Sequence, residues 1–162
     1  MNNIIFKMEL NIKMLHSSSH RASHRTSYRD ERDFCQRKHL SDALMQQYPN
    51  CIPVIVERSV IEIDLPIIDK RQYLVPHTMN VGNFLFMIRR RLGIASWVGI
   101  WIYTGKYPLS VASIPLIEIY NNYRDPDGFL YIQYRGEDRF GSYDLKQKDK
   151  FPEYEDTTKK IY

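Results

Sequence analysis

The chain lacks the features that would place it in several familiar classes of protein. It has only 2 cysteines, Cys35 and Cys51, and their separation fits neither a zinc site nor a disulfide framework, which suits a reducing compartment. No apolar run reaches the roughly 18 residues that a membrane-spanning helix requires. Any attachment to a membrane must therefore come from a surface patch or from a covalent lipid.

What the sequence does contain is sufficient for one core. A chain of 162 residues that is 43% hydrophobic and 13% aromatic can bury one core and hardly two. The formal net charge of +4 predicts a partner with an acidic surface, such as anionic lipid, acidic peptide or nucleic acid.

The first part of the chain differs in composition from the rest. Residues 1–15 alternate apolar with polar side chains, and residues 16–29 are rich in His, Ser and Arg and cannot build a core. We expect residues 1–29 to form a disordered basic arm. Because acidic residues are scarce here, a mitochondrial-type transit peptide is one alternative. Another is that the arm reflects a misplaced start codon upstream of Met14. The histidines here lack a cysteine or carboxylate to complete a metal shell, so no metal site is predicted.

The globular pattern begins at Asp30. Residues 30–48 predict one or two amphipathic helices, with Phe34, Leu40, Leu44 and Tyr48 at near-helical spacing. Further on we expect the following elements: strands at 52–57, 60–65 and 72–76, a helix at 81–92 capped by Asn80 and Gly93, a strand at 98–104, a helix at 111–123, a turn at 125–128 and a closing strand at 129–134. This order predicts an α+β roll in which a mixed sheet clasps an apolar helix.

A glycine follows the closing strand by a short distance. The chain reads Phe140-Gly141 and then continues as a polar segment, residues 142–162, with no core-forming pattern. Because glycine has no Cβ, Gly141 could pass through a narrow protease or ligase channel. We expect a precursor that is trimmed at Gly141 and joined through the new carboxylate; an ordinary turn glycine before a disordered tail is the alternative.

Several motifs in the same order point to one family. The stretches YPNCIPVIVER, IDLPIIDKRQYLVPHTMNVGNFLFMIRRRL and DPDGFLYIQY and the terminal RFG resemble the autophagy ubiquitin-like modifiers, the family that includes GABARAP, from about Phe34 to Gly141. The resemblance implies a ubiquitin-like β-grasp with two extra N-terminal helices. It divides the chain into the arm, a modifier domain at residues 30–141 and a propeptide at 142–162.

The resemblance also implies a sequence of partners and no catalysis by the chain itself. A processing cysteine protease would cut between Gly141 and Ser142. Activating and conjugating enzymes would then carry Gly141 as an adenylate and a thioester, and would link it to phosphatidylethanolamine without a cofactor. Two acyl chains hold a protein on a membrane, so a cytoplasmic protein would move to autophagosome or other vesicle membranes.

The resemblance further implies a docking function. Members of this family bind receptors and adaptors that carry aromatic-x-x-aliphatic motifs, in a way that resembles β-augmentation, in which the peptide pairs with an exposed strand edge. The pocket for the aromatic side chain would use Leu44, Pro53, Leu74 and Phe129. The pocket for the aliphatic side chain would use Tyr73, Val75, Pro76, Met79, Phe84 and Met87, with Lys70 and Arg91 meeting acidic flanks. The alternative is that these residues are ordinary core.

The sequence departs from the family pattern around the first pocket and beyond it. Leu40 stands where a glutamate is usual, and Cys51 and Gln72 stand where basic residues are usual, which weakens the expected preference for acidic ligands. Residues 107–120 are longer than usual, so a second docking face at residues 101–103 is in doubt.

Other classes of function have weaker support. An RNA-binding arm lacks a recognisable RNA motif, so nucleic acid is not expected as the partner. A hydrolase built on Cys51 and His77 lacks an orienting acid and an oxyanion site. The serious alternative is an adaptor that binds peptide motifs or tubulin and is never conjugated.

Overall fold

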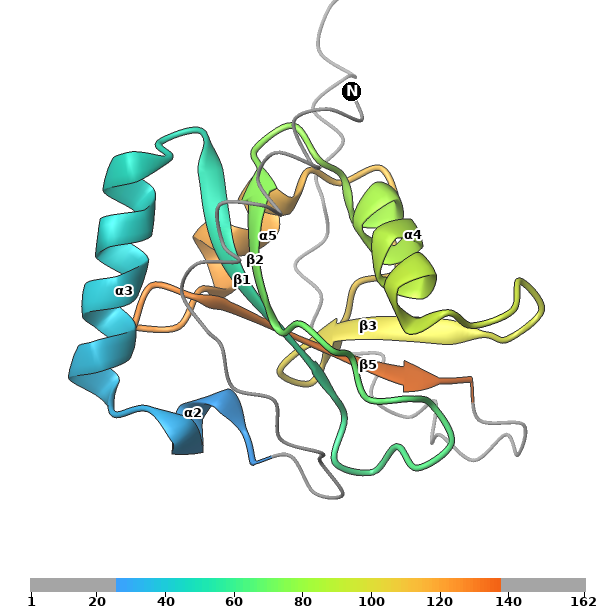
Figure 1. Cartoon of the computed structure of the whole chain (residues 1–162). Helices are drawn as coiled ribbons and strands as arrows, with labels where there is room; N and C mark the ends of the chain where they lie inside the picture. Colours follow the sequence, from blue (N-terminus) through green and yellow to red (C-terminus); the bar gives the residue numbers. More distant parts are fainter. Residues whose placement is uncertain (1–25, 138–162) are drawn as a thin grey trace, which may run out of the picture.

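Two parallel strands lie at the centre of the sheet. The computed structural model describes residues 26–137, so most of the arm, and the segment that holds Gly141 and Ser142, lie outside the described residues. The sheet has the order β2-β1-β5-β3-β4, with β1 and β5 parallel and the other neighbours antiparallel. Its strands are β1 (Cys51–Arg58), β2 (Gln72–Pro76), β3 (Ile100–Thr104), β4 (Tyr107–Pro108) and β5 (Leu130–Gly136) (Figure 1). The predicted α+β class and mixed sheet are confirmed.

The folded domain begins before Asp30. Helix α2 (Tyr28–Glu31) is capped by Ser27, and the backbone N–H of Tyr28 donates to Oε1 of Glu57 in β1 at 2.7 Å. The Tyr28 side chain is buried. The arm that we predicted at residues 1–29 therefore ends too late. Its last residues, 27–29, belong to the folded domain because the carboxylate of Glu57, far along the chain, holds the start of this short helix.

Helix α3 (Phe34–Gln47) turns an unexpected face toward the sheet. Its buried residues are Arg37, Ser41 and Leu44, whereas Phe34 is 48% exposed. Phe34, one of the four residues at near-helical spacing, is therefore not part of the buried face. The helix places a charged and a small side chain inward because both have partners on a turn about ninety residues away in sequence, which periodicity alone cannot show.

That turn is the DPDG segment before β5. Nε of Arg37 donates to Oδ2 of Asp127 at 2.7 Å, and the hydroxyl of Tyr131 donates to the same oxygen at 2.7 Å. The backbone N–H of Phe129 donates to the other carboxylate oxygen at 3.0 Å, and Ser41 donates to the Asp127 carbonyl. Asp127 is 0% exposed. Each of its three oxygens accepts a hydrogen bond, and together these bonds position α3 and the start of β5.

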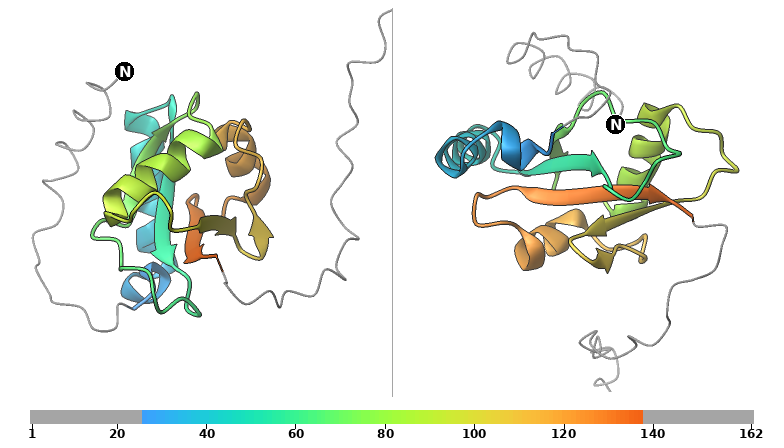
Figure 2. Two further views of the ribbon diagram at one scale, coloured as in Figure 1. Left: turned by 90° about the vertical axis from the view of Figure 1, so that its right-hand side faces the viewer. Right: turned by 90° about the horizontal axis from the view of Figure 1, so that it is seen from below.

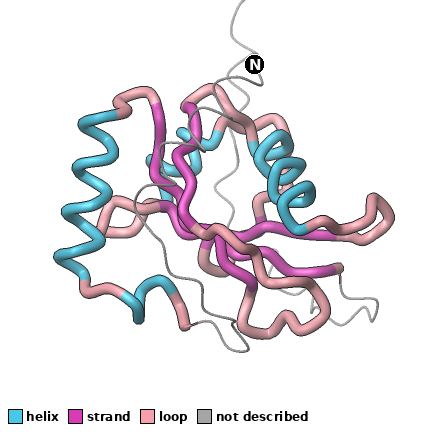
Figure 3. Tube along the Cα trace, in the orientation of Figure 1, coloured by secondary structure: helices cyan, strands magenta, loops and turns pink. Residues whose placement is uncertain are grey.

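The connection between β1 and β2 contains no second strand. We predicted a strand at residues 60–65, but this segment is a loop (Figure 3). The carboxylate of Glu62 accepts from the backbone N–H groups of Asp64 and Leu65, and Ser59 donates its backbone N–H to the carbonyl of Tyr134. These bonds occupy donors that a strand would have offered to a neighbour. The aliphatic alternation here was misleading.

The remaining helices follow the prediction with one change. Helix α4 (Val81–Leu92) begins after Asn80, which accepts from the backbone N–H of Asn83, and ends at Gly93 with φ of 64°. Helix α5 (Leu116–Tyr123) is shorter than predicted, because Pro115 occupies its N-cap position in extended geometry. Strand β4 was not predicted. None of the helices within residues 26–137 has the length and apolarity to cross a bilayer.

Alternation along the strands divides the apolar side chains between two faces. One cluster packs under α4 and α5 and includes Val54, Val56, Tyr73, Val75, Phe84, Ile88, Leu116 and Ile132. The other packs under α3 and consists of Tyr28, Leu44, Ile55 and Phe129, with Leu40, Leu74 and Tyr131 at its margin. We call them the α4 cluster and the α3 cluster.

We predict that Asp127→Ala destabilises the protein by about 3–5 kcal/mol, because it leaves the Arg37 guanidinium buried without its counter-charge. Chemical denaturation would measure the loss. Asp125→Ala is the matched control, since Asp125 pairs with Arg29, whose side chain is 51% exposed, and should cost less than about 1 kcal/mol. Equal losses from the two substitutions would show that the buried pair has no special role.

Candidate functional site

Strand β2 offers a backbone edge between α3 and α4 (Figure 1). Within the described residues, β2 pairs only with β1, and its register places Val54 opposite Tyr73 and Ile52 opposite Val75. The backbone carbonyl of Arg71 accepts from the N–H of Val56, and the N–H of His77 donates to the carbonyl of Asn50. The backbone N–H and C=O groups of the odd-numbered residues 71–77 therefore point to β1. In an antiparallel ladder the intervening residues point the other way. The backbone N–H and C=O of Leu74 therefore face the outer edge, where a further strand can pair.

The structure brings together the residues expected for the first pocket. Leu44 of α3 and Phe129 belong to the α3 cluster, and the half-buried Leu74 packs at its margin. Pro53 is buried and lies opposite Leu74 in the ladder. Phe129 is 0% exposed, so it forms the floor of this region, whereas Leu74 offers the accessible surface.

The residues expected for the second pocket gather on the opposite face of the same strand. Tyr73, Val75 and Phe84 are buried in the α4 cluster, with the ring centroids of Tyr73 and Phe84 6.2 Å apart in an edge-on arrangement. Met79 and Met87 pack against this cluster and are only partly buried. The aromatic and β-branched members of this set are core, whereas the two methionines are only partly buried, and their side chains are adaptable. Their role in a pocket stays a prediction.

Pro76 and two basic residues lie around the ends of β2. Pro76 is the last residue of the strand and is half-buried. Nζ of Lys70 lies 5.9 Å from the ring centroid of Tyr73. Nε of Arg91 donates to Oδ1 of Asp69 at 2.9 Å, and Asp69 is 69% exposed. The basic groups expected at acidic flanks thus lie beside β2, and Asp69 partly balances Arg91.

The three departures from the family pattern fall on the same surface. Leu40 is half-buried against the α3 cluster, Gln72 begins β2, and Cys51 begins β1 opposite Pro76. Burial raises the pKa of the Cys51 thiol, which disfavours the thiolate that a cysteine nucleophile requires. The arrangement makes the first pocket more apolar and gives no support to a hydrolase at Cys51 and His77.

Tyr28 is a core residue behind the first pocket that the sequence did not reveal. Its ring meets Phe129 edge-on at 5.7 Å between centroids, and Arg71 lies 5.6 Å from its ring centroid. Its hydroxyl is buried and has no hydrogen-bond partner among residues 26–137, and burial raises its pKa. A lone tyrosine in a polar, basic stretch gave no periodic signal that could have assigned it to the core.

The strand that leads toward Gly141 is held where the described residues end. The Glu62 carboxylate accepts from the backbone N–H of Gly136, the last residue of β5. Partial burial acts to raise the pKa of Glu62, but the three backbone N–H donors and nearby Arg58 outweigh it and lower the pKa. The charged form of Glu62 therefore fixes the point from which the C-terminal segment departs.

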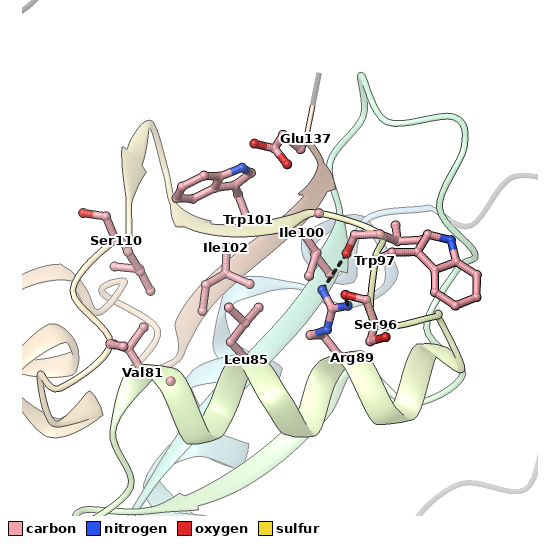
Figure 4. Close-up of a pocket in the computed structure, with 15 residues that line it drawn as sticks. Val81, Leu85, Arg89, Ser96, Trp97, Ile100, Trp101, Ile102, Ser110 and Glu137 are labelled. Atoms are coloured by element: carbon pink, nitrogen blue, oxygen red, sulfur yellow. Dashed lines mark hydrogen bonds between the residues drawn. The ribbon is translucent and has the colours of Figure 1, made fainter. Parts of the chain in front are cut away.

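A cavity of about 360 Å³ lies between α4 and β3, on the side of α4 away from β2 (Figure 4). Val81 and Leu85 of α4 face Ile102 of β3 across it. At one end Nη1 of Arg89 donates to the carbonyl of Val98 at 2.7 Å. Trp101 borders this cavity and is 42% exposed, so a hollow exists near the second docking face that the sequence left in doubt.

We predict that Glu62→Gln lowers the free energy of unfolding at neutral pH by about 1 kcal/mol, because an amide replaces a charged acceptor. A lowered folded-state pKa gives stability that is present above the unfolded value of about 4.3 and is lost as pH falls through the folded value. The difference between variant and parent should therefore shrink in acid, as measured by urea unfolding. Asp64→Asn, in the same loop, should change stability by less than about 0.5 kcal/mol at either pH; a pH-independent Glu62→Gln difference would contradict the assignment.

Comparison with known proteins agrees with this geometry. Residues 36–141 match the family described as Autophagy protein Atg8 ubiquitin like. Autophagy-related protein 8 of Mycosarcoma maydis is 38% identical over 105 residues, covering 65% of this chain and 87% of that protein. The corresponding protein of Pichia angusta is 41% identical over 105 residues, covering 65% of this chain and 82% of the relative.

A solved structure supports the fold as well as the family. The crystal structure of Trypanosoma brucei ATG8 superposes with a TM-score of 0.65 at 30% identity, covering 73% of this chain and 100% of that one. The ubiquitin-like fold with additional N-terminal helices is thereby confirmed. The chain belongs to the Atg8 family of autophagy-related ubiquitin-like proteins.

Proposed function

We propose that this protein is a docking platform for receptors and adaptors with aromatic-x-x-aliphatic motifs. The observation that carries the proposal is the outer edge of β2, which has one apolar cluster on each of its faces. A peptide strand that pairs with Leu74 would direct alternate side chains toward α3 and α4. Its aromatic residue would meet Leu74, and its aliphatic residue would meet Met79 and Met87.

The second half of the proposal concerns Gly141. The family match ends at this residue, and residues 142–162 follow it. A processing protease would cut after Gly141, and activating and conjugating enzymes would then form an amide between its carboxylate and the amine of phosphatidylethanolamine. The lipid would bring the docking platform to autophagosome membranes, and the chain itself would act as a modifier and not as an enzyme.

Gly141→Ala tests the conjugation. Intact mass of the cellular protein should show the parent chain ending at Gly141, with a lipid-linked fraction that floats with membranes, whereas the alanine variant should stay full length and off membranes. A Cβ at this position would obstruct a narrow channel. The substitution lies outside residues 26–137 and removes none of the contacts described within them, so stability should change by less than about 1 kcal/mol. Ser142→Ala is the control and should be processed normally. Detection of only full-length parent chain, ending at Tyr162 while autophagy is active, would favour the non-conjugated adaptor.

Peptide titration tests the docking edge. Leu74→Ala combined with Met87→Ala should weaken binding of an aromatic-x-x-aliphatic peptide at least about tenfold, because each pocket loses its accessible apolar surface. Phe86→Ala is the matched control: it lies next to Met87 in α4 but is 62% exposed, and it should leave binding within about twofold. Gln72→Lys should tighten binding of a peptide with acidic flanks. Unchanged binding by a folded double variant would exclude this edge.

A further inference from the structure

The most exposed apolar side chains gather at one end of the domain. Among the large hydrophobic residues of the described part of the chain, Val60 is 92% exposed, and Ile63 and Trp97 are each 82% exposed. Ile61, at 62%, lies beside the first two. These residues occupy two loops, 59–65 between β1 and β2 and 94–98 between α4 and β3, which we call the exit loops.

The first exit loop turns the carboxylate of Glu62 back onto its own backbone. Glu62 turns back to accept backbone N–H groups within the loop, while Nη1 of Arg58 donates to the carbonyl of Leu65 at 2.8 Å. The hydroxyl of Tyr134 also donates to the carbonyl of Pro66 at 2.7 Å. The loop thus has many of its backbone groups paired and turns Val60, Ile61 and Ile63 to solvent, while Leu65 is buried.

The second exit loop is folded around a cation. Arg89 donates to the carbonyls of Val98, Ala95 and Ser96 at 2.7, 2.9 and 2.9 Å, and the N–H of Val98 closes a turn onto Ala95 at 3.1 Å. This leaves the indole of Trp97 at the outside of a structured loop. Paired backbone groups and an exposed indole are what a loop needs to enter the interfacial region of a bilayer.

Both exit loops hold the end of β5. The N–H of Gly136 donates to Glu62 in the first loop, and the N–H of Glu137 donates to the carbonyl of Gly99, just after the second, at 3.1 Å. Figure 2 shows the first loop beside the end of β5 in both of its views. The exposed aliphatic residues and Trp97 therefore lie on two loops that flank the end of β5, from which the chain continues toward Gly141.

We infer that the exit loops insert Val60, Ile61, Ile63 and Trp97 into the surface of a lipid bilayer. The inference rests in part on the proposed function: Gly141 lies five residues after Gly136, a distance of at most about 18 Å, so a lipid on Gly141 would keep the exit loops near the headgroups. Insertion then buries apolar surface that is otherwise wet. It also fixes the orientation of the domain, which a single covalent tether leaves free.

The charges at this end indicate that apolar contact drives the insertion. Arg90 at the end of α4 is exposed, and Asp64 and Glu137 are exposed as well, so exposed charges of both signs lie within and beside the exit loops. Binding should therefore occur on zwitterionic vesicles and persist at high salt, unlike attraction to anionic lipid, which salt screens.

The experiment uses the full chain with Gly141→Ala, which carries no covalent lipid, and phosphatidylcholine vesicles with and without phosphatidylserine. Trp101→Phe leaves Trp97 as the single tryptophan, whose emission should shift to shorter wavelength on vesicle addition and be quenched by lipids with brominated acyl chains. Changing Val60, Ile61 and Ile63 together to Ser should lower the vesicle partition coefficient at least about tenfold, since three aliphatic side chains no longer enter the bilayer. Val111→Ser, at another exposed aliphatic position, 51% accessible, should leave it within about twofold.

Three results would overturn the inference. They are a Trp97 emission that vesicles leave unchanged, equal losses from the triple Ser variant and from Val111→Ser, and a Trp97 that is already shielded without vesicles, which would place another segment or a second copy of the chain over it. Because the test protein cannot be conjugated, a failure of conjugation leaves the result intact. A chain that is conjugated normally while its Trp97 stays in water would refute the insertion alone.

Discussion

The buried contact between Arg37 and Asp127 determines how the N-terminal helices join the sheet. It fixes α3 against the turn that starts β5, with Ser41 donating to the Asp127 carbonyl and Tyr131 donating to its carboxylate. Replacing such a pair by apolar residues is often neutral, so its value lies in position more than in net energy. The contact thereby positions α3 so that Leu44 and Leu74 pack in the same cluster.

The outer edge of β2 follows from that arrangement. An unpaired edge invites unwanted association, and this one is short: it is bounded by Lys70 before it and by Pro76, which has no N–H, at its end. With α3 and α4 on its two sides, the proposed docking would be selective, because a peptide strand would gain most from pairing if it offered apolar side chains to both clusters. Its shortness would limit unwanted association and would suit the short motif that we propose as its ligand.

The docking edge and the exit loops are different surfaces of one sheet. Residues 72–76 form the edge, whereas residues 59–65 and 94–98 flank the end of β5. A peptide on β2 would therefore not compete with a bilayer at the exit loops. The loop between β1 and β2 connects the two regions. The bonds that Glu62 and Arg58 make within this loop therefore hold both the first exit loop and the approach to β2.

The sequence by itself determined the α+β class, the span of α4 with its Asn80 and Gly93 caps, the DPDG turn and the closing strand, because these depend on local periodicity and on residues with strong turn and cap preferences. Its motif order also indicated the family. Only the tertiary structure decided that Arg37 faces inward, that Tyr28 belongs to the core and that residues 60–65 form a loop. Each of these depends on a partner distant in sequence, Asp127, Phe129 or Gly136, and local pattern carries no information about such contacts.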